Sequence, residues 1–151
     1  ETMDSWLNEG YIHCGTRSKH IPPMGTEYID NAALFSVAFI NGTLLSQILN
    51  DMFFYHELRE AEDIIFQIEY LTRGYKNRQA NLYTHQKKTW QQGGCFQSGR
   101  TRDTTLKANT ALTKKYPNYV FLNKPRDGIS TLKCRWKQAY KDSQINSLWK
   151  I

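Results

Sequence analysis

The stretch FYHELREAEDIIFQIEYLTR, residues 54–73, repeats apolar side chains at steps of four and three residues. In a helix these residues would form one apolar stripe: Phe54, Leu58, Ala61, Ile65 and Ile68. The opposite face would carry polar residues: His56, Glu60, Asp63 and Gln67. Arg73 and Gly74 then supply a cation and a helix stop. The pattern predicts an amphipathic helix over residues 54–73.

A short helix is predicted near residues 104–115, in the C-terminal half. Asp103, Thr104 or Thr105 can cap its N-terminus, and Pro117 stops it after Lys115.

A β-hairpin over residues 119–137 is predicted to follow this helix. Two strand-like runs flank the turn 123–128, which contains Pro and Asp-Gly. Alternation in the second strand turns Leu132, Cys134 and Trp136 to one side, where we expect Trp136 in the core. The opposite, exposed side would carry three cations that we call the basic comb: Lys133, Arg135 and Lys137.

Toward the N-terminus, the predictions are less uniform. Residues 34–40 favour a strand, and Asn41-Gly42 is a hairpin signal. Thr43 can instead cap a helix whose apolar residues recur at helical spacing up to Phe53, and we favour this helix. After the helix 54–73, the polar segment 77–91 is interpreted as a second helix, which would end at Gly93-Gly94. Together these elements predict an α+β fold, and 151 residues with 40% apolar content predict one domain over residues 1–151.

Charge is segregated along the chain. Residues 1–70 contain 3 Lys and Arg against 11 Asp and Glu, a net charge of −8. Residues 71–151 contain 17 against 3, a net charge of +14, and the whole chain carries +6. Either the acidic half neutralises the basic half, or the basic half presents a positive face to a polyanion.

The cysteine and hydropathy patterns point to no cofactor and no membrane span. Cys14, Cys95 and Cys134 show no metal-ligand spacing and at most one disulfide, so we expect neither a metal nor another cofactor. The apolar run 31–50 is interrupted by polar residues and is interpreted as core. These residues contain no signal peptide pattern, and we expect a soluble protein of undetermined compartment.

The stretch Gly94–Thr101 has the spacing of a phosphate-binding P-loop, with Arg100 in place of the motif's Lys. A polar segment precedes it where a P-loop needs a buried strand, so nucleotide hydrolysis is not predicted. A simpler anion site remains open, because Arg100, Arg102 and a helix N-terminus all favour phosphate. An ordinary solvated loop is the alternative.

A second candidate site lies in residues 11–20. His13 and His20, with Arg17 and Lys19 between them, could cleave a phosphodiester by acid–base catalysis, as in a small secreted or delivered toxin-like nuclease. The alternative is that these histidines are structural. A further interpretation is that Cys14 acts as a thiol nucleophile. The alternative is that Cys14 is a buried thiol without a catalytic role.

The leading functional hypothesis concerns the basic C-terminal half. Its cations are interleaved with aromatic residues, a combination that suits nucleic acid because charge neutralises phosphate and rings stack on bases. The predicted contact residues are cations: Arg100, Arg102, Lys114, Lys115, Lys133, Arg135 and Lys137. A further alternative is an interaction protein that self-associates through its oppositely charged halves.

Overall fold

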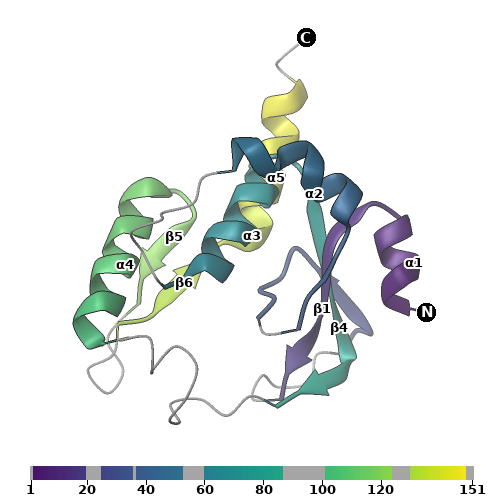
Figure 1. The fold of residues 1–151 in the computed structure, drawn as a ribbon, viewed down its shortest axis with the longest axis horizontal. Helices are drawn as coiled ribbons and strands as arrows, with labels where there is room; N and C mark the ends of the chain where they lie inside the picture. Colours follow the sequence, from purple (N-terminus) through teal and green to yellow (C-terminus); the bar gives the residue numbers. More distant parts are fainter. Residues whose placement is uncertain are drawn as a thin grey trace.

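The computed structural model describes residues 2–19, 25–35, 37–52, 60–86, 101–123 and 130–148. Over these residues the chain is a small α+β domain with a mixed four-stranded sheet, a separate two-stranded hairpin and five α-helices (Figure 1). In chain order the elements are α1 (Thr2–Asn8), β1 (Tyr11–Ser18), β2 (Tyr28–Asp30), β3 (Phe39–Ile40), α2 (Gly42–Ile48), the 3-10 helix η1 (Leu49–Asp51), α3 (Glu62–Thr72), β4 (Lys76–His85), α4 (Arg102–Lys115), β5 (Val120–Leu122), β6 (Leu132–Cys134) and α5 (Trp136–Leu148). The predicted α+β class is confirmed.

The four-stranded sheet has the order β2-β4-β1-β3. Its central strands β1 and β4 are parallel, and the short edge strands β2 and β3 are antiparallel to them. The predicted strand 34–40 is correct only at its end, because the described residues 32–35, 37 and 38 form an irregular segment. That segment lies directly against β1: a Cβ on Gly15 would sit 2.5 Å from the carbonyl oxygen of Val37. The segment before β3 therefore requires glycine at this point of β1.

The prediction of a helix over residues 77–91 is wrong, because residues 76–85 form β4 at the centre of the sheet. Residues 87–91 lie outside the described residues. Asn77, Gln79 and Asn81 are all buried, although the segment was interpreted as a polar helix. The side chain of Asn77 bonds both backbone groups of Ala32, so tertiary contacts satisfy its polar atoms inside the fold.

The predicted helix 54–73 is confirmed in its C-terminal part as α3. Residues 53–59 lie outside the described residues, and Ala61 is left-handed with a φ of 64°, so α3 starts at Glu62. Ile65 and Ile68 are buried as expected. Gln67, which was placed on the exposed face, is also buried, and its amide bonds both backbone groups of Leu34.

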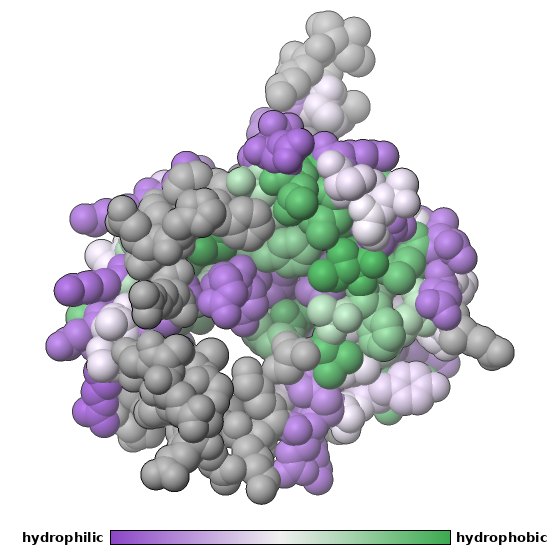
Figure 2. All heavy atoms as spheres, viewed as in Figure 1, coloured by the Kyte–Doolittle hydropathy of each residue, from purple (hydrophilic) through white to green (hydrophobic). Residues whose placement is uncertain are grey.

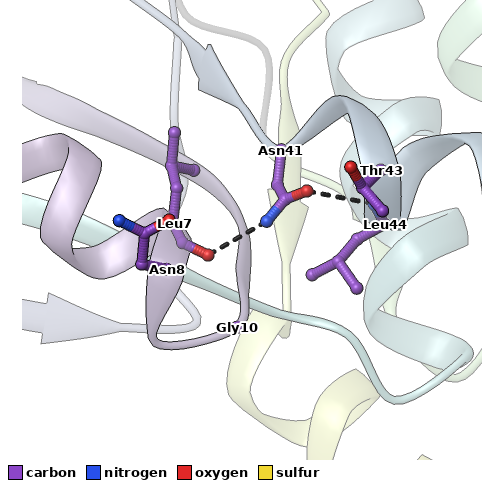
Figure 3. Close-up of a pocket in the computed structure, with 6 residues that line it drawn as sticks. All are labelled: Leu7, Asn8, Gly10, Asn41, Thr43 and Leu44. Atoms are coloured by element: carbon purple, nitrogen blue, oxygen red, sulfur yellow. Dashed lines mark hydrogen bonds between the residues drawn. The ribbon is translucent and has the colours of Figure 1, made fainter.

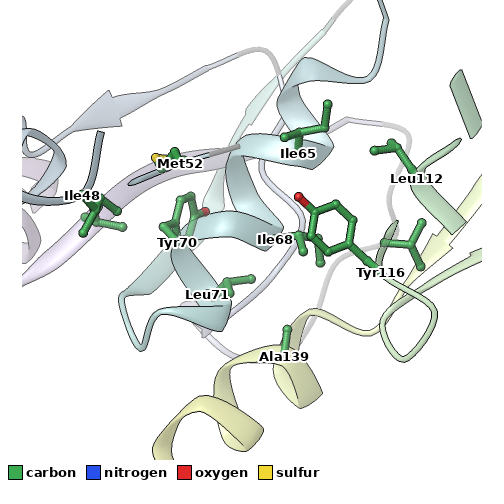
Figure 4. Close-up of a cluster of buried hydrophobic side chains, with 11 residues drawn as sticks. Ile48, Met52, Ile65, Ile68, Tyr70, Leu71, Leu112, Tyr116 and Ala139 are labelled. Carbon is green, nitrogen blue, oxygen red and sulfur yellow. The ribbon is translucent and has the colours of Figure 1, made fainter. Parts of the chain in front are cut away.

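One apolar core joins the two halves of the chain (Figure 4). Ile65, Ile68 and Leu71 of α3 lie at its centre, and Leu112 of α4 and Ala139 of α5 pack onto them. The remaining buried members are Ile12, Ile48, Met52, Tyr70, Tyr116 and Val120. The C-terminal elements are therefore held by the same core as β1 and α2.

The predicted helix near residues 104–115 is confirmed as α4. Thr101 is its N-cap, and the Thr101 and Thr104 side chains form a reciprocal capping box. The hairpin is confirmed as well, since β5 and β6 pair antiparallel. Its turn, residues 124–129, lies outside the described residues.

The second hairpin strand ends earlier than predicted, at Cys134, and α5 starts at Trp136. Trp136 is half-buried against the core and meets Phe35 edge-on at 6.5 Å between ring centres. Sequence reasoning missed α5, because its buried side contains small residues such as Ala139 and Ser143.

Asn41 begins α2, which corrects the expectation of a Thr43 cap (Figure 3). Its side-chain oxygen accepts from the Leu44 backbone N–H, and its Nδ2 donates to the Leu7 carbonyl at the end of α1. A shallow pocket of about 420 Å³ lies beside these residues and is lined by both polar and apolar side chains. Asn41 thus starts one helix and ties it to another.

None of the described helices has the length and apolar character that crossing a bilayer requires.

Candidate functional site

The described C-terminal residues, 101–123 and 130–148, form what we call the C-terminal segment. Its eight cations are all exposed: Arg102, Lys107, Lys114, Lys115, Lys133, Arg135, Lys137 and Lys141. Its carboxylates are Asp103 and Asp142. Arg100 lies outside the described residues. The segment therefore carries a large excess of exposed positive charge.

Seven of these cations, all except Lys115, form no ion pair within the part of the chain that the structure describes. Several carboxylates of the first seventy residues have other partners. Asp30 and Glu9 pair with Arg78, and Glu69 pairs with Arg73 at 2.6 Å. Most of the C-terminal cations are therefore not neutralised by a carboxylate of the described residues.

The basic comb does not form along one strand as predicted. Lys133 lies on β6 opposite Phe121, and the guanidinium carbon of Arg135 lies 4.6 Å from the centre of the Phe121 ring. Lys137 belongs to α5, where it shares an exposed face with Lys141 because the two are four residues apart. The three residues of the basic comb are all exposed, but Lys133 lies on β6, Arg135 lies between β6 and α5, and Lys137 lies on α5.

A second group of cations lines α4. Lys107 and Lys114 are seven residues apart and share one face, whereas the buried residues Ala108 and Leu112 lie on the other. In Figure 2, hydrophilic residues stand out along the side of the molecule where α4 lies in Figure 1. The prediction omitted Lys107 and Lys141, although their helical spacing to Lys114 and Lys137 was a usable signal.

The N-terminus of α4, predicted as an anion site, already contains a carboxylate of the protein. Glu60 is buried, and its carboxylate accepts hydrogen bonds from the hydroxyls of Thr104 and Thr105, the latter at 2.6 Å. Residues 87–100 lie outside the described residues. Because a negative group is favourable at a helix N-terminus, Glu60 fulfils the role that was expected of a phosphate.

The predicted catalytic residues lie on or beside β1. His13 is only 4% exposed, and burial lowers its pKa to about 4. Arg17 is buried too, and its Nε donates to the Asn81 carbonyl at 3.4 Å, whereas Lys19 is exposed. His20 lies outside the described residues. The structure shows no converging acid–base pair among the described residues, and the nuclease hypothesis stays a prediction.

His13 is held by a chain of buried hydrogen bonds. Nδ2 of Asn77 donates to the hydroxyl of Tyr70, which lies 3.1 Å from Nδ1 of His13. The Tyr70 hydroxyl can donate to Nδ1 of His13 or accept from it, and the histidine tautomer decides which. Nε2 of His13 is buried and has no hydrogen-bond partner among the described residues.

Both described cysteines are free thiols, and burial raises the pKa of Cys14 and of Cys134 to about 12. Cys95 lies outside the described residues. A thiol with a raised pKa is a poor nucleophile, so these two cysteines do not support thiol catalysis.

Sequence reasoning missed a cluster of rings around Arg78. Its guanidinium carbon lies 3.9 Å from the ring centre of Tyr28, 4.2 Å from that of Tyr11 and 5.3 Å from that of Trp6. The same guanidinium donates twice to Asp30, at 2.7 and 3.0 Å. Because Trp6 lies on α1, this cluster fixes α1 to the sheet and has a structural role.

Comparison with protein-family models, with curated proteins and with solved structures finds no match.

Proposed function

We propose that this protein binds nucleic acid through the exposed cations of its C-terminal segment. The observation that supports this proposal is the combination of exposure and missing neutralisation: seven exposed Lys and Arg side chains form no ion pair within the described residues. Such side chains can replace the counterions that surround phosphate groups, and release of those counterions drives binding.

The hairpin adds aromatic surface to this charge. Phe121 is half-buried on the face of β5 away from the core, with Lys133 opposite it and Arg135 above its ring. Guanidinium and aromatic planes both stack on nucleobases, and single strands expose bases for such stacking. We therefore expect single-stranded nucleic acid to bind at least as well as duplex.

The test is fluorescence anisotropy with labelled single-stranded RNA, single-stranded DNA and duplex DNA over a series of salt concentrations. The affinity should fall steeply with salt. The double variant Lys133→Ala/Lys137→Ala should lower the slope of log affinity against log salt by about 0.7 for each phosphate of a single strand that is no longer neutralised. Arg135 is not replaced, because its guanidinium contacts the Phe121 ring and its loss would also change the packing of the hairpin.

A matched control separates local contact from net charge. Lys19→Ala/Lys76→Ala removes the same charge from the end of β1 and the start of β4, outside the C-terminal segment. This control should retain its salt slope, apart from a small uniform loss of affinity. The proposal would be contradicted if both double variants changed the salt slope equally, or if the Lys133→Ala/Lys137→Ala variant bound nucleic acid as the wild type does.

A further inference from the structure

Arg135 and Phe121 form a cation–π pair on the hairpin. The guanidinium carbon of Arg135 lies 4.6 Å from the centre of the Phe121 ring. Val120 and Cys134, which are paired across the hairpin, pack toward the core, so Phe121 points to the opposite face. Because the ring covers one side of the guanidinium and Arg135 is exposed, the other side faces solvent. We call it the outer side of Arg135.

The polar atoms of this guanidinium are not engaged by the protein. The side chain of Arg135 forms no hydrogen bond and no ion pair with the residues that the structure describes. Asp142, the carboxylate of α5, accepts instead from the Tyr119 hydroxyl at 3.1 Å and from Nε2 of Gln138 at 2.6 Å. A guanidinium is planar and has five N–H donors, so it can stack on a flat group and still donate at its edge.

The pair lies among exposed cations. Lys133 is opposite Phe121 on β6, and both point to the face of the hairpin that is turned away from the core. β5 also packs beside α4, which carries Lys107 and Lys114 (Figure 1). These lysines can contact phosphates while the outer side of Arg135 contacts a base.

The geometry favours a single strand as the ligand of this position. In a duplex the bases stack on one another, and their faces are not accessible to a protein side chain. An unpaired base can stack on an aromatic ring or on an arginine guanidinium. The outer side of Arg135 therefore adds binding energy for a single strand and none for an intact duplex.

Given the proposed nucleic-acid binding, on which this assignment rests, we propose that a base of a single strand stacks on the outer side of Arg135, which Phe121 supports from below. This stacking position makes the protein prefer single strands to duplex. It tolerates any sequence, because every base has a π-face.

The test compares two labelled single strands of equal length by fluorescence anisotropy: oligothymidine, and an abasic strand with the same phosphates and no bases. The wild type should bind oligothymidine about tenfold more tightly than the abasic strand. Arg135→Lys keeps the charge and removes the plane, so it should lose most of this preference and bind the abasic strand as the wild type does.

Two further variants locate the effect. Phe121→Leu keeps apolar bulk in the hairpin and removes the ring under the guanidinium, so it should also reduce the preference for oligothymidine. Arg102→Lys is the matched control, because Arg102 is exposed at the start of α4 and contacts no ring of the described residues. This control should keep the full preference. Thermal melts verify that each variant retains the fold.

The outcomes separate the stacking position from nucleic-acid binding itself. Equal affinity of the wild type for both strands, an undiminished preference in Arg135→Lys, or an equal loss in Arg102→Lys would overturn the stacking position. If both strands still bound in a salt-dependent manner, the proposed function would stand without it. If neither strand bound, both the function and the stacking position would be refuted.

Discussion

Replacing Asn77 by alanine should destabilise the protein more than any exposed asparagine replacement. Asn77 is fully buried on β4, and its amide makes three hydrogen bonds: it accepts from Ala32 N at 2.9 Å and donates to Ala32 O at 3.0 Å and to the Tyr70 hydroxyl at 2.6 Å. These bonds give the irregular segment before β3 the pairing that a neighbouring strand would otherwise provide.

The magnitude follows from the groups left behind in Asn77→Ala. Ala32 is itself buried, so its N–H and its carbonyl both lose their partner inside the protein. Each unsatisfied buried group costs about 1–3 kcal/mol, and the two together predict a loss of about 2–6 kcal/mol in the free energy of unfolding. For a chain of this size each kcal/mol lowers Tm by about 2–4 °C.

The assay is urea unfolding, with Asn50→Ala as the control because Asn50 is exposed on η1. The control should change the free energy of unfolding by less than about 0.5 kcal/mol. Amide hydrogen exchange should show Ala32 losing protection in the Asn77 variant before its neighbours do. A loss below about 1 kcal/mol with an unchanged m-value would refute the reasoning, because Ala32 would then have found other partners.

Three further outcomes are expected. Tyr116→Phe removes the hydroxyl that donates to the buried carboxylate of Glu69, and chemical denaturation should show a loss of about 1–3 kcal/mol; no loss would mean that this contact is not formed in solution. Burial lowers the pKa of His13 from its ordinary 6.5 to about 4, so between these pH values the unfolded chain binds a proton that the native chain does not. The free energy of unfolding should therefore fall by roughly 3 kcal/mol as the pH drops from 6.5 to 4. Urea unfolding at several pH values should show a smaller fall in the His13→Phe variant, and the same fall in the variant would disprove the assignment to His13. Arg78→Lys keeps the charge but loses the paired bonds to Asp30 and the stacking on three rings, so thermal melts should show a loss of about 1–2 kcal/mol, whereas a wild-type Tm would show that charge alone suffices.

The sequence predicted those parts of the fold whose local pattern agrees with their tertiary setting. Residues 102–115 carry a cap, an apolar side and a following Pro, and they form α4. The hairpin and the C-terminal part of α3 were also predicted from their local sequence patterns, and both form in the structure. In these elements the side chains that look apolar are the ones that the core buries.

The failures occur where polar side chains are buried. β4 was predicted as a helix because the segment 77–91 is polar, and only the positions of Ala32 and Thr26 reveal the partners of Asn77 and Asn81. Those partners lie more than forty residues away in the chain, so no local pattern could identify them.

The candidate site was predictable in its charge and not in its geometry. Segregated charge indicated a cationic half, and the eight described cations of its C-terminal segment are exposed, whereas Arg78 of the same half is buried. Which carboxylates are engaged elsewhere depends on contacts such as Glu60 with Thr105, which the sequence does not contain. The burial of His13 likewise depends on α3 covering β1.

The parallel pairing of β1 with β4 also bears on how the nascent chain folds. Cys14 of β1 aligns with Arg78 of β4, so the strand at the centre of the sheet gains its main neighbour only after more than sixty further residues have been synthesised. Contacts this distant in sequence form slowly, because a long loop must close first. We therefore expect that the acidic first half leaves the ribosome without a stable sheet and that the fold closes only when β4 has emerged.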